Sequence, residues 1–314
     1  MKLQQIVTQY VGLKHSMGMC FRSEGAILKA FCRALGDIDI MEVDTRCVQA
    51  FLDGKGVVTA FWRQKFRVLD RFYRYSIGRG YIDSSPLPKT IPKWPESLTP
   101  HIYTPEELRR LITATDSLKT PMSPLQACTF RTLVLTLYGT GLRISEALSL
   151  TLDDVNLAES LIIVRNSKFF KTRLVPIGPC LTAELRRYAR RRRQLPRPAG
   201  ESSAFFVTRS GNALSYGRMA VTFRMLRNLA AIHGKKGARY RPRIHDLRHT
   251  SAVHRLETWY REKADVQRLL PQLSTYLGHV GVAETQRYLT MTPELLREAN
   301  QRFERYTLKE VNDD

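Results

Sequence analysis

The side chains best suited to chemistry lie in one stretch near the C-terminus, residues 243–288. His245 and Arg248 are three residues apart, so on a helix they share a face. A guanidinium offers a rigid fork of donors and an imidazole can give or take a proton, a combination that suits a phosphate. His279 adds a second imidazole, and Tyr288 follows nine residues later. A phosphate-binding site beside a tyrosine hydroxyl predicts covalent phosphoryl transfer.

The net charge of the chain indicates which phosphate this site would bind. Fifty Lys and Arg residues stand against 29 Asp and Glu residues among 314, which gives a formal net charge of +21. Such an excess favours a polyanionic partner, with nucleic acid ahead of an anionic membrane surface. The hydrophobic share of 43% is ordinary for a globular protein that buries a core.

The composition also argues against several other classes of protein. The five cysteines are widely spread and form no C-x-x-C pair, so we expect reduced thiols and no metal site. The N-terminal residues lack the apolar core of a signal peptide, and no apolar run approaches the ~18 residues of a membrane-spanning helix. We therefore expect a cytoplasmic protein, associated with the nucleoid, that has no membrane partner.

The first 83 residues predict a helical domain. Apolar residues recur at helical spacing in four segments, which are Leu3–Val11, Gly25–Leu35, Thr45–Leu52 and Val57–Ile77. In the last segment an apolar, largely aromatic stripe predicts a core-facing side, and the basic residues between its members predict contacts with a nucleic-acid backbone. The arginines that we expect to make these contacts are Arg63, Arg67, Arg71 and Arg74.

A proline-rich segment, residues 84–102, separates this domain from the next. It holds five of the fifteen prolines, and prolines at that density disfavour helix and strand, so the segment predicts an extended linker. The second domain, residues 103–314, opens with a helix that begins at the capping box Thr104-Pro105-Glu106-Glu107 and runs to about Thr115.

The rest of the second domain predicts helices around a small sheet. The segments Ser160–Arg165 and Arg173–Ile177 are rich in Leu, Ile and Val, which predicts two strands of a hairpin. A further short strand is predicted over Phe205–Thr208. Helices are predicted over residues 125–138, 181–197 and 216–233, and a last amphipathic helix starts at Thr292, with apolar positions up to Tyr306. The fold class is therefore mainly α with a small antiparallel β-sheet.

Several basic residues of the second domain have more than one interpretation. Arg143 begins a helix, where a cation opposes the helix dipole, so it needs an anionic partner: either Glu146 or an external phosphate. Lys168 lies at the predicted hairpin tip, where a lysine is either solvated or inserted into a cleft. For the arginine-rich helix and the later basic loop we favour contacts with the DNA backbone. The residues concerned are Arg187, Arg191, Lys235, Lys236 and Arg241.

Taken in order, five motifs resemble the tyrosine recombinase (phage integrase) family, with the nearest likeness to its Xer-like branch. They are Thr140-Gly-Leu-Arg-Ile-Ser-Glu146, the lysine between two strands, His245-Asp-Leu-Arg-His249, Leu277-Gly-His279 and Tyr288. The segment Arg67–Pro86 resembles the end of the family's N-terminal core-binding domain. The resemblance implies a two-domain clamp on duplex DNA, in which a helical DNA-binding domain precedes a catalytic domain that ends in a helix.

The resemblance also implies roles for the residues that bind the phosphate. Arg143 and Arg248 match the two arginines that hold the non-bridging oxygens of the scissile phosphate. His245 and His279 match the histidine positions that complete the site, and His245 helps to accept the proton of the nucleophile. Two guanidiniums neutralise the charge that develops during phosphoryl transfer. We therefore expect a reaction that needs no cofactor and no metal.

The remaining roles concern the bonds that break and form. Tyr288 matches the nucleophile, which gives a 3′-phosphotyrosyl link; its hydroxyl, of pKa ~10, is a weak nucleophile unless a cationic pocket favours the phenolate. Lys168 matches the hairpin lysine that protonates the leaving 5′ oxygen. Glu146 and His249 are expected to lie behind the residues that touch the phosphate.

The chain departs from the family pattern in places and offers rivals for two of the roles. The segment Val266–Tyr276, before Leu-Gly-His, is longer than is common and contains a proline. Tyr276 is a rival nucleophile by residue type, although its place before that motif favours a core position. Lys171 is a rival to Lys168 as the general acid. Where the family commonly has a histidine shortly after the nucleophile, this chain has Leu289-Thr290.

The expected partners follow from the resemblance. They are double-stranded DNA with a specific recombination site and further copies of the chain, as a tetramer that exchanges C-terminal helices, with room for an accessory recombinase or a DNA-bending protein. Two other functions stay open: a type IB topoisomerase, which relaxes DNA as a monomer, and a non-catalytic DNA-binding accessory protein of the same fold. The sequence predicts neither the target site nor whether the reaction integrates, excises, resolves or transposes DNA.

Overall fold

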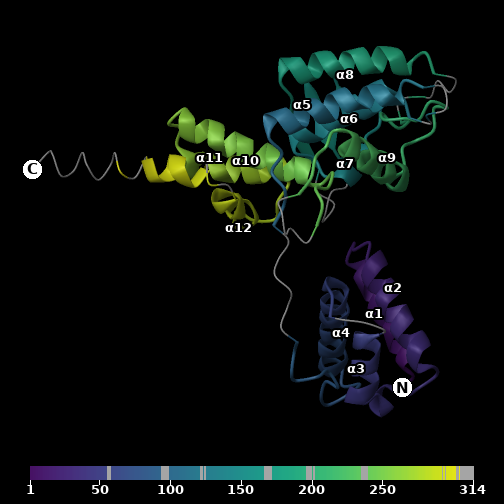
Figure 1. Ribbon diagram of the computed structural model, residues 1–314. Helices are drawn as coiled ribbons and strands as arrows, with labels where there is room; N and C mark the ends of the chain where they lie inside the picture. Colours follow the sequence, from purple (N-terminus) through teal and green to yellow (C-terminus); the bar gives the residue numbers. More distant parts are fainter. Residues whose placement is uncertain are drawn as a thin grey trace, which may run out of the picture. The chain divides into compact units, whose positions relative to one another are not determined.

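The chain divides into two compact units, Met1–Ser97 and Leu98–Asp314 (Figure 1). The computed structural model describes every residue except 55–57, 93–98, 121–122, 124, 166–171, 196–199, 201, 235–239, 292, 294, 302–303 and 305–314. In the proline-rich segment, residues 84–92 and 99–102 form neither helix nor strand. No helix in the described part of the chain combines the length and the apolarity that crossing a bilayer requires.

The first unit is helical, as the apolar spacing predicts. Its helices are α1 (Leu3–Ser16), α2 (Arg22–Leu35), α3 (Thr45–Asp53) and α4 (Ala60–Gly78). A local signal sets the start of α3, where the Asp44 side chain accepts a hydrogen bond from the Cys47 amide. Both α1 and α2 pack against α4, whose Phe72 and Tyr73 are fully buried among them.

Helix α4 has a buried apolar side and an exposed basic side. Trp62, Leu69 and Phe72 are buried, whereas Arg67, Arg71 and Arg74 are exposed and follow one another at helical spacing. The predicted apolar stripe included Phe61 and Ile77, near the two ends of α4. These two side chains are 55% and 38% exposed, so the stripe that is buried is shorter than predicted.

The second unit combines a three-stranded antiparallel sheet with a group of helices. The strands β1 (Val155–Asn156), β2 (Leu161–Val164) and β3 (Arg173–Pro176) pair in that order, with Ile162 opposite both Val155 and Val175. The main helices are α5 (Pro105–Ala114), α6 (Ala127–Thr140), α7 (Ile144–Ser149), α8 (Pro179–Arg192), α9 (Tyr216–Leu229), α10 (Asp246–Arg261) and α11 (Val266–Leu277). The short helix α12 (Ala283–Gln286) leads into a 3-10 turn, η4 (Arg287–Thr290).

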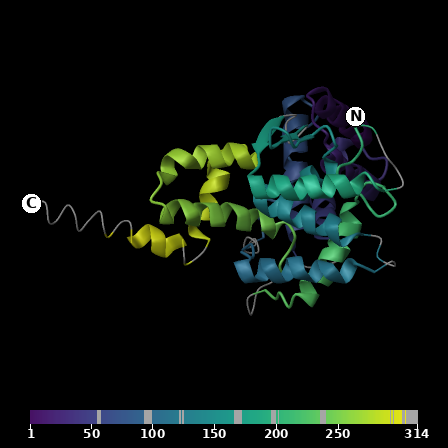
Figure 2. The same cartoon turned by 90° about the horizontal axis from the view of Figure 1, so that it is seen from above.

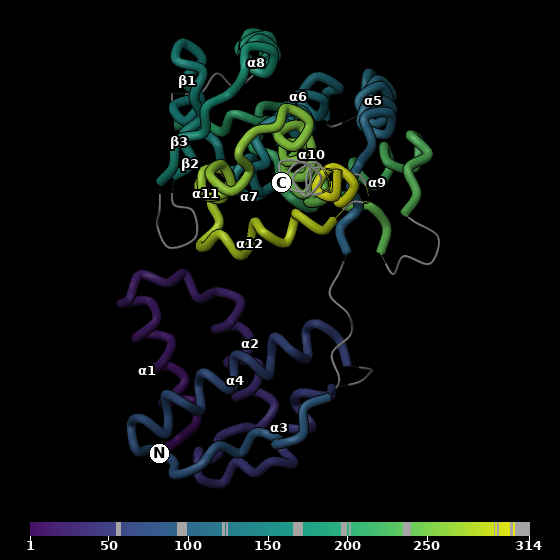
Figure 3. Tube along the Cα trace, turned by 90° about the vertical axis from the view of Figure 1, so that its left-hand side faces the viewer, coloured from purple at the N-terminus to yellow at the C-terminus, as the bar shows by residue number. Residues whose placement is uncertain are grey.

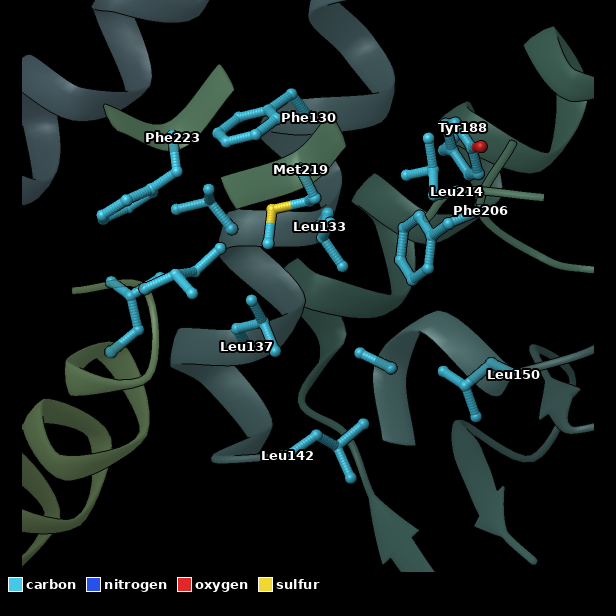
Figure 4. Packing of buried hydrophobic residues seen from close by; sticks show 14 of the residues in the cluster. Phe130, Leu133, Leu137, Leu142, Leu150, Tyr188, Phe206, Leu214, Met219 and Phe223 are labelled. Carbon is cyan, nitrogen blue, oxygen red and sulfur yellow. The ribbon is translucent and has the colours of Figure 1, made fainter. Parts of the chain in front are cut away.

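Helix α6 forms the centre of this unit. It packs against α8 and α10, as two perpendicular views agree (Figures 1 and 2). Its mostly apolar sequence predicts such burial, and Figure 4 shows Phe130, Leu133 and Leu137 beside Met219 and Phe223 of α9. Helix α11 lies against β3 (Figure 3), which brings the sheet to the residues that follow α11.

One predicted strand and two predicted helix ends are wrong. No strand covers Phe205–Thr208; an isolated bridge joins Val207 to Ala213 instead. The helix predicted to Arg197 ends at Arg192, whose buried guanidinium donates hydrogen bonds to the carbonyls of Ala204 and Phe205. These carbonyls therefore bond to a side chain rather than to a strand. Helix α9 ends at Leu229, four residues before the predicted end.

Replacing Leu133 by alanine tests the packing around α6. Leu133 is fully buried, so Leu133→Ala is expected to lower the free energy of unfolding by ~2–5 kcal/mol, through lost burial and the cavity left behind. Urea denaturation of the full chain, followed by circular dichroism, measures the change. Leu229→Ala is the matched control: its side chain is 61% exposed, and we expect a change within ~0.5 kcal/mol. Equal effects would contradict the packing described here.

Candidate active site

Arg248 lies at the centre of the candidate site. It is in the first turn of α10 and is only 3% exposed. Its Nη1 donates a hydrogen bond to the Gly141 carbonyl at 2.6 Å, and its Nη2 donates one to the Leu277 carbonyl at 2.8 Å. Both carbonyls belong to C-terminal helix ends, of α6 and α11, where carbonyls lack partners within the helix and the dipole is negative.

Two glycines allow these helix ends to converge on Arg248. Gly141 and Gly278 end α6 and α11 with φ of +62° and +71°, a left-handed conformation that glycine adopts without strain. A Cβ at Gly141 would lie 2.6 Å from Cδ2 of Leu277, so a larger residue there would require the Leu277 side chain to move, in a backbone conformation that side chains disfavour. The sequence motifs Thr-Gly-Leu-Arg and Leu-Gly-His thus build the pocket as well as supply side chains to it.

Arg143 has the anionic partner that its position requires. Glu146 accepts hydrogen bonds from both the Arg143 amide and its Nη1, each at 2.9 Å. Nη2 of Arg143 donates to the Gly278 carbonyl at 3.0 Å. The Arg143 side chain is 27% exposed. Arg143 therefore contacts the same turn as Arg248, but from the side that faces solvent.

Arg173 is a member of this network that the sequence analysis missed. Its Nη1 and Nη2 donate to Oε1 and Oε2 of Glu146 at 3.1 and 2.8 Å. Burial alone would raise the pKa of Glu146, but the bonds from Arg173 and Arg143 outweigh it and lower that pKa to about 2. The alternation of side chains along a strand could have indicated that Arg173 points inward. Arg173 lies on the same face of β3 as Val175, which is fully buried.

Tyr288 is buried in the same pocket, in η4, with 2% of its surface exposed. Its hydroxyl lies 3.1 Å from Nδ1 of His249. Its ring lies 6.0 Å from the ring of His279, between centroids. Burial raises the pKa of Tyr288, and the positive charges of Arg248 and Arg287 oppose that shift. In this arrangement the hydroxyl is neutral and needs a proton acceptor before it can attack.

The histidines around Tyr288 are held neutral. Burial, followed by the positive charge of neighbours, lowers the pKa of His249 to about 3 and that of His279 to about 4. The pKa of His245 is lowered in the same way, by burial and by Arg248. The His245 ring stands at 90° to the ring of His249, 5.1 Å away. Nδ1 of His279 lies 2.7 Å from Oγ1 of Thr285, a contact that orients its ring.

Five predicted site residues therefore meet in one region: Arg143, His245, Arg248, His279 and Tyr288. Glu146 and His249 lie directly behind them, in contact with Arg143 and Tyr288. The rival tyrosine, Tyr276, donates its hydroxyl to the Pro176 carbonyl at 3.1 Å and packs against the core. Lys168 and its rival Lys171 lie outside the described residues, as do Lys235 and Lys236.

The other predicted DNA contacts differ in exposure. Arg67, Arg71, Arg74, Arg191 and Arg241 are exposed. Arg187 is paired with Glu184 and its side chain is 64% exposed. Arg63 is half-buried. Among the described residues, no group of three or more His, Cys, Asp or Glu side chains is arranged to hold a metal ion.

The fold is that of DNA-recombining integrases. The chain matches the structure described as a lambda integrase tetramer bound to a Holliday junction, with a TM-score of 0.64 and 18% identity over 92% of this chain and 77% of that one. A model of the phage integrase family matches residues 102–294. The chain belongs to the phage integrase family, whose members are tyrosine recombinases.

Two relatives support this assignment along most of the chain. The y4rB protein of Sinorhizobium fredii, which carries a provisional name as an integrase/recombinase, is 34% identical over 96% of this chain and 97% of its own length. The tyrosine recombinase XerA of Pyrococcus horikoshii is 33% identical over 66% of this chain and 62% of its own. The first relative covers both units, whereas the second matches a shorter part of the chain.

The neutral histidines predict how stability depends on pH. Below pH 6.5 the unfolded chain protonates His249 and His279, but the folded protein resists until pH 3–4. The unfolded state therefore binds more protons, and the free energy of unfolding falls from pH 7 to pH 5. Urea denaturation across this range measures the slope. In the double variant His249→Asn/His279→Asn, the free energy of unfolding should depend less steeply on pH, by the uptake of roughly one proton for each histidine removed. Equal slopes in the variant and the wild type would argue against these pKa shifts.

Proposed function

We propose that the protein is a site-specific DNA recombinase that breaks and rejoins DNA through a covalent link to Tyr288. The observation that carries the proposal is the Tyr288 hydroxyl, buried beside His249, His279 and the Arg248 guanidinium of the same chain. A phenol surrounded by neutral imidazoles and a fixed cation is arranged to lose its proton and attack an electrophile that carries negative charge.

Two arginines would hold the scissile phosphate. The carbonyls of Gly141 and Leu277 take two of the five N–H donors of Arg248, which leaves donors that can face Tyr288 and a phosphate oxygen. Arg143 is more exposed and adds a second guanidinium at the same turn. Phosphoryl transfer depends mainly on positioning and charge stabilisation, which two fixed guanidiniums supply.

The proton of Tyr288 would pass to an imidazole. Nδ1 of His249 is already in hydrogen-bond reach of the hydroxyl, and its lowered pKa keeps it unprotonated and able to accept. His245, which the family resemblance implies as the acceptor, stands next to His249 with its ring at 90° to that ring, and would act by holding it in place. His279 would donate to a phosphate oxygen, and Lys168 would protonate the leaving 5′ oxygen. The phosphotyrosyl bond conserves the energy of the broken bond for rejoining.

The partner would be double-stranded DNA with a specific site. The exposed arginines of α4 lie on one side of the helix at helical spacing, which suits successive backbone phosphates. Arg191 and Arg241 offer exposed cations in the second unit. In this proposal residues 1–83 form the core-binding domain, residues 84–102 the linker and residues 103–314 the catalytic domain.

The working assembly would be a tetramer on two DNA sites. A lambda integrase of the same fold has been described as a tetramer on a Holliday junction. In this chain residues 295–301 are helical, with Leu295 buried in the cluster that contains Tyr288 and Leu296 49% exposed. Residues 302–303 and 305–314, beyond them, lie outside the described residues. This C-terminal segment is the one we propose for exchange between subunits.

Replacing the nucleophile tests the function. The substrate is a nicked suicide duplex that carries the native recombination site, and the product is a covalent protein–DNA adduct seen on a denaturing gel. We expect the adduct with the wild-type protein and with Tyr276→Phe, and none with Tyr288→Phe. An adduct that survives in Tyr288→Phe would assign the chemistry to another residue. Relaxation of plasmids that lack the site would favour the topoisomerase, and binding without any adduct would favour the accessory protein.

Replacing the two histidines separately tests the path of the proton. In the same assay at saturating DNA, His249→Asn keeps a polar side chain but removes the base, so cleavage is expected to slow by ~100-fold or more. His245→Asn is expected to slow cleavage less, because His245 acts through its neighbour. Single-turnover cleavage rates give the comparison. The reverse order of effects would make His245 the direct acceptor.

A further inference from the structure

We infer that Arg173 is a positioning residue for the reaction: by sharing Glu146 with Arg143 and bracing the turn after α11, it leaves Arg143 with its positive charge available to the DNA phosphate. The inference rests on the proposed function. It concerns a residue that no motif in the sequence marks.

Each nitrogen of the Arg173 guanidinium donates a hydrogen bond to a group of the protein. Besides its two bonds to Glu146, its Nε donates to the Tyr276 carbonyl at 3.1 Å. Every nitrogen of the guanidinium thus has a partner, and the side chain is only 10% exposed. Arg173 therefore acts through other residues rather than by touching DNA.

The carboxylate of Glu146 is shared by two arginines. Oε1 accepts from Nη1 of both Arg143 and Arg173, and Oε2 accepts from the Arg143 amide and from Nη2 of Arg173. If Arg143 were the only partner, its charge and that of Glu146 would cancel. With Arg173 the group of three carries +1. Arg143 can then be held in place by Glu146 and still offer net positive charge to a phosphate.

Arg173 also braces the turn that carries His279. Its guanidinium packs so closely on Gly278 that a Cβ there would lie 2.7 Å from Nη1. The same turn accepts the bond from Arg143, through the Gly278 carbonyl. Because Arg173 is the first residue of β3, it joins the start of that strand to Glu146 at the start of α7 and to the turn after α11. One largely buried side chain thus connects three elements of the candidate site.

The test compares Arg173→Ala and Arg173→Lys with wild type, and uses two suicide duplexes. One has an ordinary scissile phosphate. The other has a methylphosphonate there, which lacks one non-bridging oxygen and its charge. Single-turnover cleavage is measured at saturating DNA, and DNA affinity is measured separately. Arg109→Ala is the control, because Arg109 forms an ion pair with Glu106 whose side chains are 73% and 68% exposed.

On the ordinary phosphate we expect Arg173→Ala to slow cleavage by ~100-fold, with DNA affinity changed less than about threefold. Arg173→Lys should recover part of the rate, because an ammonium can restore one bond and the charge. On the methylphosphonate the loss in Arg173→Ala should shrink to below about tenfold, as it should in Arg143→Ala, since less charge needs neutralising. Arg109→Ala should match wild type on both duplexes.

Other results would overturn the inference. An equal loss on both duplexes would mean that Arg173 supports only the fold, and a loss confined to DNA affinity would place it at the DNA surface. Cleavage by Arg173→Ala at the wild-type rate would remove its role altogether. If the wild-type protein formed no adduct with the ordinary duplex, the proposed function itself would fall.

Discussion

A buried guanidinium held by two helix ends determines how the catalytic unit is put together. Arg248 donates to the carbonyls of Gly141 and Leu277, and so joins α10 to the C-terminal ends of α6 and α11. Removing a cation from water is costly unless it is well paired. Here the partners are carbonyl dipoles, and burial together with the charge of Arg143 lowers the pKa of Arg248 to about 10. The pocket is therefore short of negative charge, and a bound phosphate would supply it.

The ionic groups around Arg248 add to the excess of positive charge at the site. Glu146 is the carboxylate that pairs with both Arg143 and Arg173, and its pKa of about 2 keeps it ionised at any pH at which the protein would work. The histidines contribute no charge, because their pKa values are lowered. Charge at the site thus comes from groups that do not titrate near neutral pH, whereas the groups that could transfer a proton, Tyr288 and the histidines, are neutral.

Sequence patterns predicted the parts of this structure that depend on neighbouring residues. The capping box at Thr104 and the apolar spacing of α4 and α6 are local signals, and the helices form where those signals lie. The motifs with Arg248, His279 and Tyr288 were recognisable because the family keeps them together. The strand predicted over Phe205–Thr208 was wrong: its aromatic and β-branched residues fit a strand, but Arg192, thirteen residues before Phe205, donates a hydrogen bond to the Phe205 carbonyl.

Contacts between distant residues could not be predicted in this way. Whether Arg143 faces Glu146 or a phosphate was open from the sequence, and the answer depends on Arg173, 27 residues after Glu146. The contact of His249 with Tyr288 spans 39 residues. Neither separation corresponds to a helical or strand repeat, so only the packing of α10, α11 and β3 brings these side chains together.

The choice of main-chain oxygens for Arg248 has a consequence for how the protein tolerates substitution. Every residue has a main-chain carbonyl, so no point mutation can delete either acceptor of Arg248. For the same reason, a lost Arg248 cannot be compensated by exchanging the charge of a partner side chain. What a mutation can change is the helix ending itself, at Gly141 or Gly278, where a β-carbon would collide with Leu277 or Arg173. The positions most sensitive to substitution at these two acceptors are thus two residues without side chains, which have no functional group of their own.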